Sequence, residues 1–194
     1  MTVKDIVEKV AVFLDRKDIL EYLKTGATEN YLSVIEDVNL LVNCYNVVGE
    51  EIASLYYRFK TTERLSPNLS GVIKIADFKK NPLAIISVKD VNGNKVNAKI
   101  LPSEIITNLS EVIIDYYYVP DVKNLEDISD FTGTSITDRI LCYGVLTEYY
   151  LIKGGYEEAN LWHGKYINAL KNKPLTGNGK RLKGRVWQWF TILN

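Results

Sequence analysis

The sequence predicts an α+β fold, namely a helical bundle with an inserted small antiparallel β-sheet and an extended C-terminal tail. Apolar residues recur at helical spacing from about residue 3 to 54, and again over about residues 135–171. Between them, over about residues 55–120, short strand-like segments alternate with turn residues. Beyond residue 171, glycines and a proline interrupt any helical period. We therefore expect one domain over residues 1–171 and a C-terminal arm over residues 172–194.

The N-terminal region is predicted to form three helices. The first has an apolar stripe at helical spacing, and the second runs from Asp15 to Lys24 and ends near Gly26. A longer third helix begins around Thr28, which is a plausible N-cap. Gly49 either breaks this helix or weakens it. The stripe of the first helix is Val3, Ile6, Val7, Val10 and Leu14, and that of the third is Leu32, Ile35, Val38, Val42 and Tyr45.

The middle region is predicted to form one compact antiparallel sheet between the two helical regions. Five segments have the pattern of strands: YYRFKTTERL, GVIKIADF, LAIISVKD, KVNAKILP and EVIIDYYYVP. Between the third and the fourth lies Asn92-Gly93, the strongest short-range hairpin signal available. Both residues tolerate the positive φ angles that a type I′ turn requires, so we expect such a turn here.

The last of these segments places three consecutive tyrosines before a proline, in EVIIDYYYVPD over residues 111–121. Successive side chains of a strand point to opposite faces, so Tyr116 and Tyr118 share one face, while Asp115 and Tyr117 share the other. Neither face is clearly polar. We therefore expect one face to lie on the protein's own core and the other on a second layer or a second molecule.

A polar link leads to a predicted antiparallel helical hairpin over about residues 135–171. Ser135 is placed to cap its first helix, and the glycine pair at 154–155 ends that helix because glycine readily adopts the left-handed conformation of a C-cap. The glutamate pair at 157–158 begins the second helix, where negative charge suits the helix dipole. The apolar stripes are Ile136, Ile140, Tyr143, Gly144, Thr147 and Leu151 in the first helix, and Ala159, Trp162, Tyr166 and Ala169 or Leu170 in the second.

The composition is that of a globular protein with a polarised charge. The 194 residues are 46% hydrophobic and have a net charge of zero, but all six charged residues from Lys171 onward are basic. Residues 1–170 hold 18 basic and 24 acidic residues, a net charge of −6.

Cys44 and Cys142 lack partner motifs, which predicts buried free thiols in a reducing compartment. The N-terminus does not resemble a signal peptide and no stretch suits a membrane span, so we expect a cytoplasmic protein without an anchor.

Nothing in the sequence predicts catalysis, a cofactor or a metal site. The lone His163 has no second histidine or thiol nearby, which favours a packing or surface role. The acidic pairs at 50–51 and 157–158 could supply acid/base carboxylates, but solvated helix faces explain them better. Asp115, inside the tyrosine strand, is the most interesting carboxylate, and an edge or hydrogen-bonded position explains it best. We therefore expect a protein that is not an enzyme; a hydrolase would need a deep polar pocket at these carboxylates.

The C-terminal arm combines basic residues with aromatic residues, and disordered segments are normally poor in aromatic residues. In one hypothesis the arm binds nucleic acid, with its arginines and lysines on phosphates and Trp187, Trp189 and Phe190 stacked on bases. In the other it docks onto another protein, because Trp and Arg are frequent interface anchors and an extended segment can add a strand to a neighbour's sheet. A third possibility is that these residues fold back onto their own body.

Four features follow one another along the chain. They are the helical start, the small inserted β region, the IIDYYYVPD strand and the segment ITDRILCYGVLTEYYLIKGGYEEANLWHGKYINAL. This layout resembles that of the head–tail connector, or adaptor, proteins of tailed bacteriophages and prophages. The hairpin is the most telling piece, with KGG at the end of its first helix and EEANLWHGKY after it. The resemblance covers about residues 55–170, and the N-terminal helices and the arm agree with it in layout.

The resemblance implies a structural virion protein that forms a ring, usually of twelve subunits, beneath the portal in the neck and is assembled in the bacterial host cytoplasm. Its implied partners are the portal protein, a tail or stopper protein and further copies of itself; DNA would pass through the channel without specific binding, and no membrane is involved. A nucleic-acid-binding accessory protein that uses the arm is the alternative. The implied interface with the portal or a neighbouring subunit comprises Tyr116, Tyr117, Tyr118, Arg181, Arg185, Trp187, Trp189 and Phe190.

Overall fold

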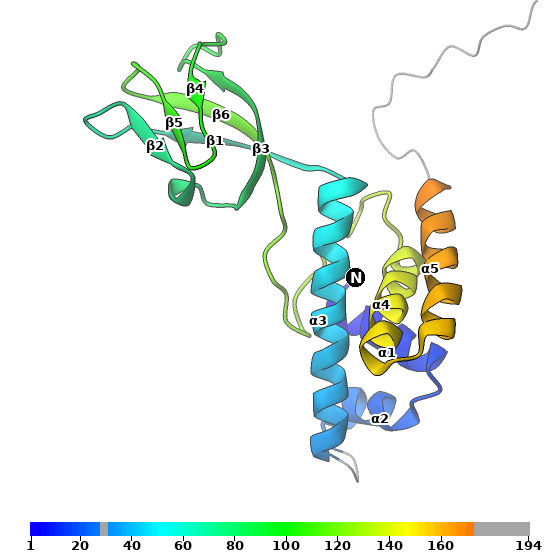
Figure 1. The fold of residues 1–194 in the computed structure, drawn as a ribbon. Coiled ribbons are helices and arrows are strands. Elements are labelled where there is room, and N and C mark those ends of the chain that lie inside the picture. The colour runs from blue at the N-terminus through cyan, green and yellow to red at the C-terminus, as the bar shows by residue number, and fades with distance from the viewer. Residues whose placement is uncertain (28–30, 173–194) are drawn as a thin grey trace, which may run out of the picture.

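The structure, a computed structural model, describes residues 1–27 and 31–172. In this part of the chain, five α-helices lie at one end and two small antiparallel sheets at the other, which confirms the predicted α+β class (Figure 1). Thr28 and the arm residues from 173 onward lie outside the described residues. The helices are α1 (Val3–Phe13), α2 (Lys17–Thr25), α3 (Tyr31–Leu55), α4 (Asp138–Lys153) and α5 (Tyr156–Lys171).

α1 begins with a capping box, in which Thr2 and Asp5 satisfy each other's backbone donors. The Asp5 backbone N–H donates to Thr2 Oγ1 at 3.2 Å, and the Thr2 backbone N–H donates to the Asp5 carboxylate at 2.7 Å. The predicted apolar stripe of α1 faces the core, and α2 ends at Gly26 with a φ of 74°, as predicted. The buried stripe comprises Val3, Ile6, Val7 and Val10.

α3 is one helix of 25 residues that passes through Gly49 without a break. A Cβ atom at Gly49 would lie 3.5 Å from the Phe131 ring, which is ordinary contact, so helix packing does not require a glycine at this position. The buried face differs from the predicted one at its start, where Leu32 is 77% exposed. Because α3 is apolar on more than one side, the spacing of its apolar residues fits two overlapping stripes and does not decide which one is buried. The buried residues include Val34, Val38, Leu41, Val48 and Ile52.

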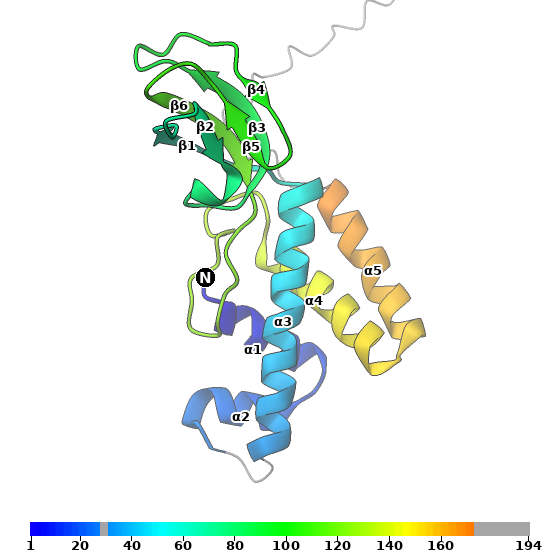
Figure 2. The ribbon, with the colours of Figure 1, turned by 60° about the vertical axis from the view of Figure 1, so that its left-hand side comes forward.

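α4 and α5 pack against each other as the predicted antiparallel hairpin (Figure 2). α4 ends at Gly154, whose φ of 79° lies in the left-handed region that a glycine adopts without strain. The beginning of α4 differs from the prediction, because the residue at the N-cap is Thr137. Ser135, expected to cap this helix, is instead buried in the segment before it.

The β region forms two three-stranded sheets rather than one compact sheet. One sheet has the order β1-β6-β3 and the other β2-β5-β4, and all neighbouring strands are antiparallel. A three-stranded sheet with one apolar face needs a second layer, and each sheet supplies it for the other. The strands are β1 (Phe59–Leu65), β2 (Val72–Lys74), β3 (Pro82–Lys89), β4 (Lys99–Ile100), β5 (Glu104–Ile106) and β6 (Val112–Tyr118).

Three details of the β region differ from the prediction. The segment GVIKIADF contains only the short β2 and then a 3-10 turn, η1 (Ile75–Asp77), and the three-residue β5 was not predicted. The turn at residues 90–94 is present, with Gly93 at a φ of 88°, but Asn92 does not have a positive φ, so it is not a type I′ turn. The Asp90 carboxylate holds this wider turn by accepting hydrogen bonds from the backbone N–H groups of Asn92 and Asn94.

The buried apolar residues form two clusters, one among the helices and one between the sheets. Aromatic rings connect the two parts of the molecule: Phe59 lies 5.6 Å from Tyr118 and 5.2 Å from Phe131, measured between ring centroids. Cys44 and Cys142 are both buried and free, as predicted. Within residues 1–27 and 31–172, no helix is long and apolar enough to span a membrane.

Candidate functional site

The three tyrosines of β6 lie in three different environments. Tyr116 is fully buried between the two sheets, with its ring 4.8 Å from that of Phe78 in an edge-on arrangement. Its hydroxyl donates a hydrogen bond of 2.8 Å to the buried Glu63 carboxylate, and burial raises the pKa of Tyr116 to about 12. This face of the strand lies on the small core between the two sheets, where Tyr116 packs against the second sheet.

The other two tyrosines lie at the edge of the β core and on the outer face. Tyr118 is partly buried beside Phe59, at the junction with the helices. Tyr117 is partly buried on the opposite face of β6, where the Arg58 guanidinium lies 5.3 Å from the centre of its ring. Of the three, Tyr117 and Tyr118 keep surface that a neighbouring molecule could contact, and Tyr116 does not.

Asp115 is buried on the outer face of β6 and is fully hydrogen-bonded. Its carboxylate accepts hydrogen bonds from Lys89 Nζ at 2.6 Å, Thr62 Oγ1 at 2.6 Å and Ser87 Oγ at 2.9 Å. These donors, with Lys89 first among them, hold the pKa of Asp115 well below its ordinary value. The predicted hydrogen-bonded position is therefore confirmed, although β6 is a central strand and not an edge.

Asp115 makes the stability of the sheet depend on pH. Its folded-state pKa is lowered, so its contribution is present above the ordinary value of 3.8 and is lost as the pH falls through the folded-state pKa. We expect Asp115→Asn to lower the free energy of unfolding at pH 7 by about 1.5–3 kcal/mol, the range for hydrogen bonds to charged groups. Urea titrations between pH 7 and pH 2 check this, and the variant should lose less stability than the wild type below pH 4. Equal acid sensitivity of the two proteins would contradict the assignment.

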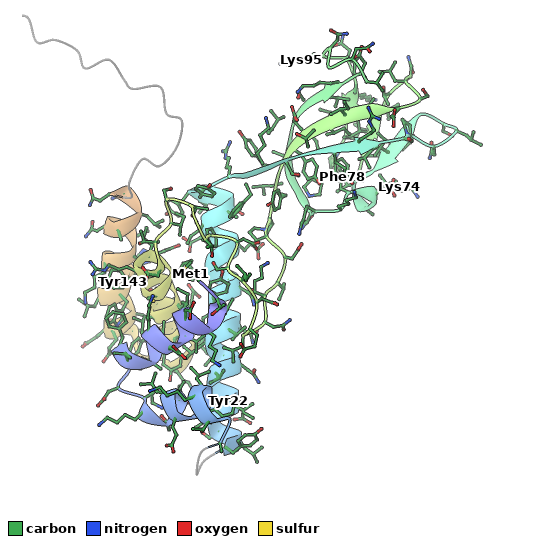
Figure 3. The ribbon with its side chains drawn as sticks, turned by 180° about the vertical axis from the view of Figure 1, so that it is seen from behind. Met1, Tyr22, Lys74, Phe78, Lys95 and Tyr143 are labelled. Carbon is green, nitrogen blue, oxygen red and sulfur yellow. The ribbon has the colours of Figure 1, made fainter. Side chains whose placement is uncertain are left out.

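An aromatic cluster covers the helical body where the end of α1 meets the α4–α5 hairpin. The Trp162 ring lies 5.4 Å from that of Phe13 and 5.6 Å from that of Tyr143, and Lys165 Nζ lies 3.9 Å from its centre. Phe13 remains 48% exposed, and the neighbouring Val12 is 64% exposed. Figure 3 shows this region from behind, with Tyr143 labelled. We call this surface, defined by Phe13, Tyr143 and Trp162, the aromatic face.

A groove lies between α3 and the chain that follows β6. It encloses about 370 Å³. Asn46 joins its two walls, because its side-chain amide donates to the Lys123 carbonyl at 2.9 Å and accepts from the Lys123 backbone N–H at 2.8 Å. Val47 and Val122 remain 53% and 80% exposed on the two walls. We call this the α3 groove; its apolar lining comprises Tyr45, Val47, Val119, Pro120, Val122 and Phe131.

Carboxylates add negative charge to the α3 groove. Asp121 and Asp130 line it and form ion pairs with Lys80 and with Lys123 respectively, the latter at 3.0 Å. Glu50 also lines the groove, and within the described part of the chain its carboxylate has no hydrogen-bond or ion-pair partner. The lining of the groove thus combines six apolar side chains with three carboxylates and one lysine.

The remaining candidate carboxylates and the histidine do not converge on a reactive arrangement. Glu51 accepts a hydrogen bond of 3.1 Å from the Tyr166 hydroxyl, and burial, with the nearby Glu51 charge, raises the pKa of Glu148. His163 is exposed on α5, as are the glutamates at 157–158. In the part of the chain that the structure describes, no group of three or more His, Cys, Asp or Glu side chains is placed to hold a metal ion.

The structure thus identifies two surfaces that the sequence did not single out, the aromatic face and the α3 groove. The sequence contained one indication of the aromatic face, because Phe13 is a large apolar residue that lies off the buried stripe of the first helix. The predicted interface residues of the arm, Arg181, Arg185, Trp187, Trp189 and Phe190, lie outside the described residues. No family model matches this chain, and no curated protein matches it either.

Proposed function

We propose that this chain is a head–tail connector subunit of a tailed bacteriophage, which forms a ring below the portal and joins the capsid to the tail. One observation carries the proposal: the helical body has two different apolar surfaces, on opposite sides of α3. The aromatic face lies on the side of α5, and the α3 groove lies on the side of the chain that follows β6 (Figures 1 and 2).

Two different apolar surfaces are what a subunit of a closed ring requires. In a ring built from head-to-tail contacts, each subunit presents one surface to the copy before it and another to the copy after it. Exposed apolar patches on a monomer commonly mark sites of protein–protein interaction. A partly exposed Phe13 on one side and exposed valines at the groove on the other supply such a pair.

The arm adds a further contact in this proposal. Residues 173–194 hold five basic and no acidic residues, and residues 1–172 hold 19 basic and 24 acidic residues. An arm of net charge +5 is therefore attracted to bodies of net charge −5, and aromatic anchors such as Trp187 and Trp189 supply the apolar part of the contact.

The test of this function uses the phage or prophage genome that encodes the chain. Deleting the gene should give heads without attached tails in electron micrographs of the lysate, and infectivity should return when the gene is supplied in trans. The variant Phe13→Glu, which places a charge on the aromatic face, should fail to restore tails. Val91→Glu, at an exposed position in the β part of the molecule, is the matched control and should restore them. Intact infectious particles from the deleted genome would refute the proposal.

A nucleic-acid-binding accessory function is the second candidate, and one observation favours it. The outer face of the β1-β6-β3 sheet carries three cations around the buried Asp115, namely Lys60, Arg64 and Lys89. On the same face, Arg58 lies over the Tyr117 ring. Together with the basic arm, this face could contact phosphates. Retention of the full chain on immobilised DNA would then fall steeply between about 50 and 200 mM salt, because binding releases counterions from the DNA.

A further inference from the structure

We propose that the α3 groove of one subunit receives residues 185–190, RVWQWF, from the C-terminal arm of the next subunit in the ring. This inference rests on the proposed ring assembly and specifies what fills one of its two surfaces. It rests on three observations: the chemistry of the groove, the charge of the arm, and the side of α3 on which α5 ends.

The α3 groove has the size and lining of a pocket for large aromatic side chains. Its volume of about 370 Å³ lies within the range of about 300–1,000 Å³ typical of ligand pockets. Six of its thirteen lining residues have apolar side chains, and the hydrogen bonds of Asn46 to Lys123 connect its two walls. If the arm segment is extended there, Trp187 and Trp189 project from the same side and can enter the groove together.

The charges of the arm and of the groove are complementary. Three carboxylates line the groove against one lysine, and Glu50 is the carboxylate that lacks a partner among the described residues. The arm segment from Lys180 to Arg185 supplies four cations within six residues, directly before the tryptophans. A tryptophan in the groove therefore brings Arg185 close to the carboxylates that line it, where Glu50 can accept its hydrogen bonds.

The place where α5 ends favours the groove of a neighbouring copy. α5 ends at Lys171, and in two views the segment directly after β6 lies on the opposite side of α3 from the end of α5 (Figures 1 and 2). In a head-to-tail ring, opposite sides of adjacent subunits face each other. The 15 residues from Lys173 to Trp187 span at most about 50 Å when extended, which suffices to cross one such contact.

Cysteine cross-linking between two populations of the full-length protein tests this inference. One population carries Val122→Cys in the groove, and the other carries Gln188→Cys, between the two tryptophans, together with a tag that changes its mass. The native Cys44 and Cys142 are each only 1% exposed, so a short bismaleimide reacts with the introduced thiols. The matched control replaces Val122→Cys by Ile152→Cys, at a position that is 59% exposed on α4.

We expect a cross-linked heterodimer with Val122→Cys and none with Ile152→Cys. The mixture is tested up to about 1 mM, where a contact worth only about 4 kcal/mol is half-formed. Absence of the heterodimer at that concentration would overturn the inference. So would a double variant, Val122→Cys with Gln188→Cys, that gives only an internal cross-link, because the arm would then occupy its own groove.

A charge reversal adds a second measurement. Glu50→Lys should reduce the yield of heterodimer about tenfold, whereas Glu36→Lys, at an exposed position on the same helix, should leave it unchanged. Equal yields for the two variants would remove Glu50 from the contact. The cross-linking result and the gene deletion test different claims. If the deletion gives tailless heads but no cross-link forms, only this inference fails. If the cross-link forms but the deleted genome still gives intact particles, only the proposed phage function fails.

Discussion

Tyr116→Ala is expected to lower the free energy of unfolding by about 3–5 kcal/mol, the range for removing a large buried aromatic side chain. Tyr116 is fully buried in the small core between the two sheets, where its ring packs on Phe78 and its hydroxyl donates to Glu63. The alanine leaves a cavity in that core and removes a hydrogen bond from a buried carboxylate, so both losses act together. Urea unfolding monitored by tyrosine and tryptophan fluorescence measures the difference.

Two further variants separate the contributions of Tyr116 from those of its neighbours. Tyr116→Phe should cost only about 1 kcal/mol, because the ring is kept and Glu63 still accepts a hydrogen bond of 3.1 Å from the Lys79 backbone N–H. Tyr117→Ala should cost no more than about 1 kcal/mol, since its ring lies on the outer face under Arg58. Equal losses for Tyr116→Ala and Tyr117→Ala would contradict the two-sheet arrangement.

Gly144→Leu is expected to lower the free energy of unfolding by at least about 3 kcal/mol, at the upper end of the effects of overpacking. Gly144 lies in α4 where that helix contacts both α3 and α5. A Cβ atom there would lie 2.6 Å from Val48 Cγ1 and 3.1 Å from the Tyr166 ring. Val48 is a stiff, β-branched residue in α3, so the backbones themselves must move apart to admit any side chain.

Gly164→Leu is the matched control and should raise the free energy of unfolding, where Gly144→Leu lowers it. Gly164 lies in α5, and a Cβ atom there would meet nothing within 4 Å. Leucine has a better helix propensity than glycine, so this variant should be more stable than the wild type by up to about 1 kcal/mol. Urea unfolding of both variants checks the pair. Destabilisation by Gly164→Leu equal to that by Gly144→Leu would show that helix propensity, and not the close helix contact, governs these positions.

The helices were the part of the fold most accessible from the sequence. The stripes of α1 and α5 and the glycine ends of α2 and α4 rest on local signals, because a helix satisfies its own backbone and shows its buried face in the spacing. α3 was harder, since it is apolar on more than one side and its first turn presents Leu32 to solvent.

The β region was less accessible because its pairing is not local. β5 has only three residues, too few for a periodic pattern, and its partners β2 and β4 lie on either side of it in the sheet. The sequence predicted contacts for both faces of the tyrosine strand, but not which groups make them. One face carries Tyr116 into a second sheet, and the other carries Asp115 into a cluster of hydroxyl and ammonium donors from β1 and β3.

The candidate surfaces depend on tertiary structure to different degrees. Phe13, off the buried stripe of its helix, was visible in the sequence, but its partners Tyr143 and Trp162 come from helices about 130 and 150 residues later. The α3 groove joins the outer side of one helix to an irregular segment after β6, and no sequence pattern encodes such a contact. The arm was recognisable from composition alone, because five basic residues precede two tryptophans and no acidic residue interrupts them.

The most direct test of the connector function is cryo-electron microscopy of the neck of particles produced from the genome that encodes this chain. We expect a ring of copies between the portal and the tail, in which the aromatic face of each helical body meets the α3-groove side of the next. Intact infectious particles whose neck contains no density for this chain would contradict the proposal.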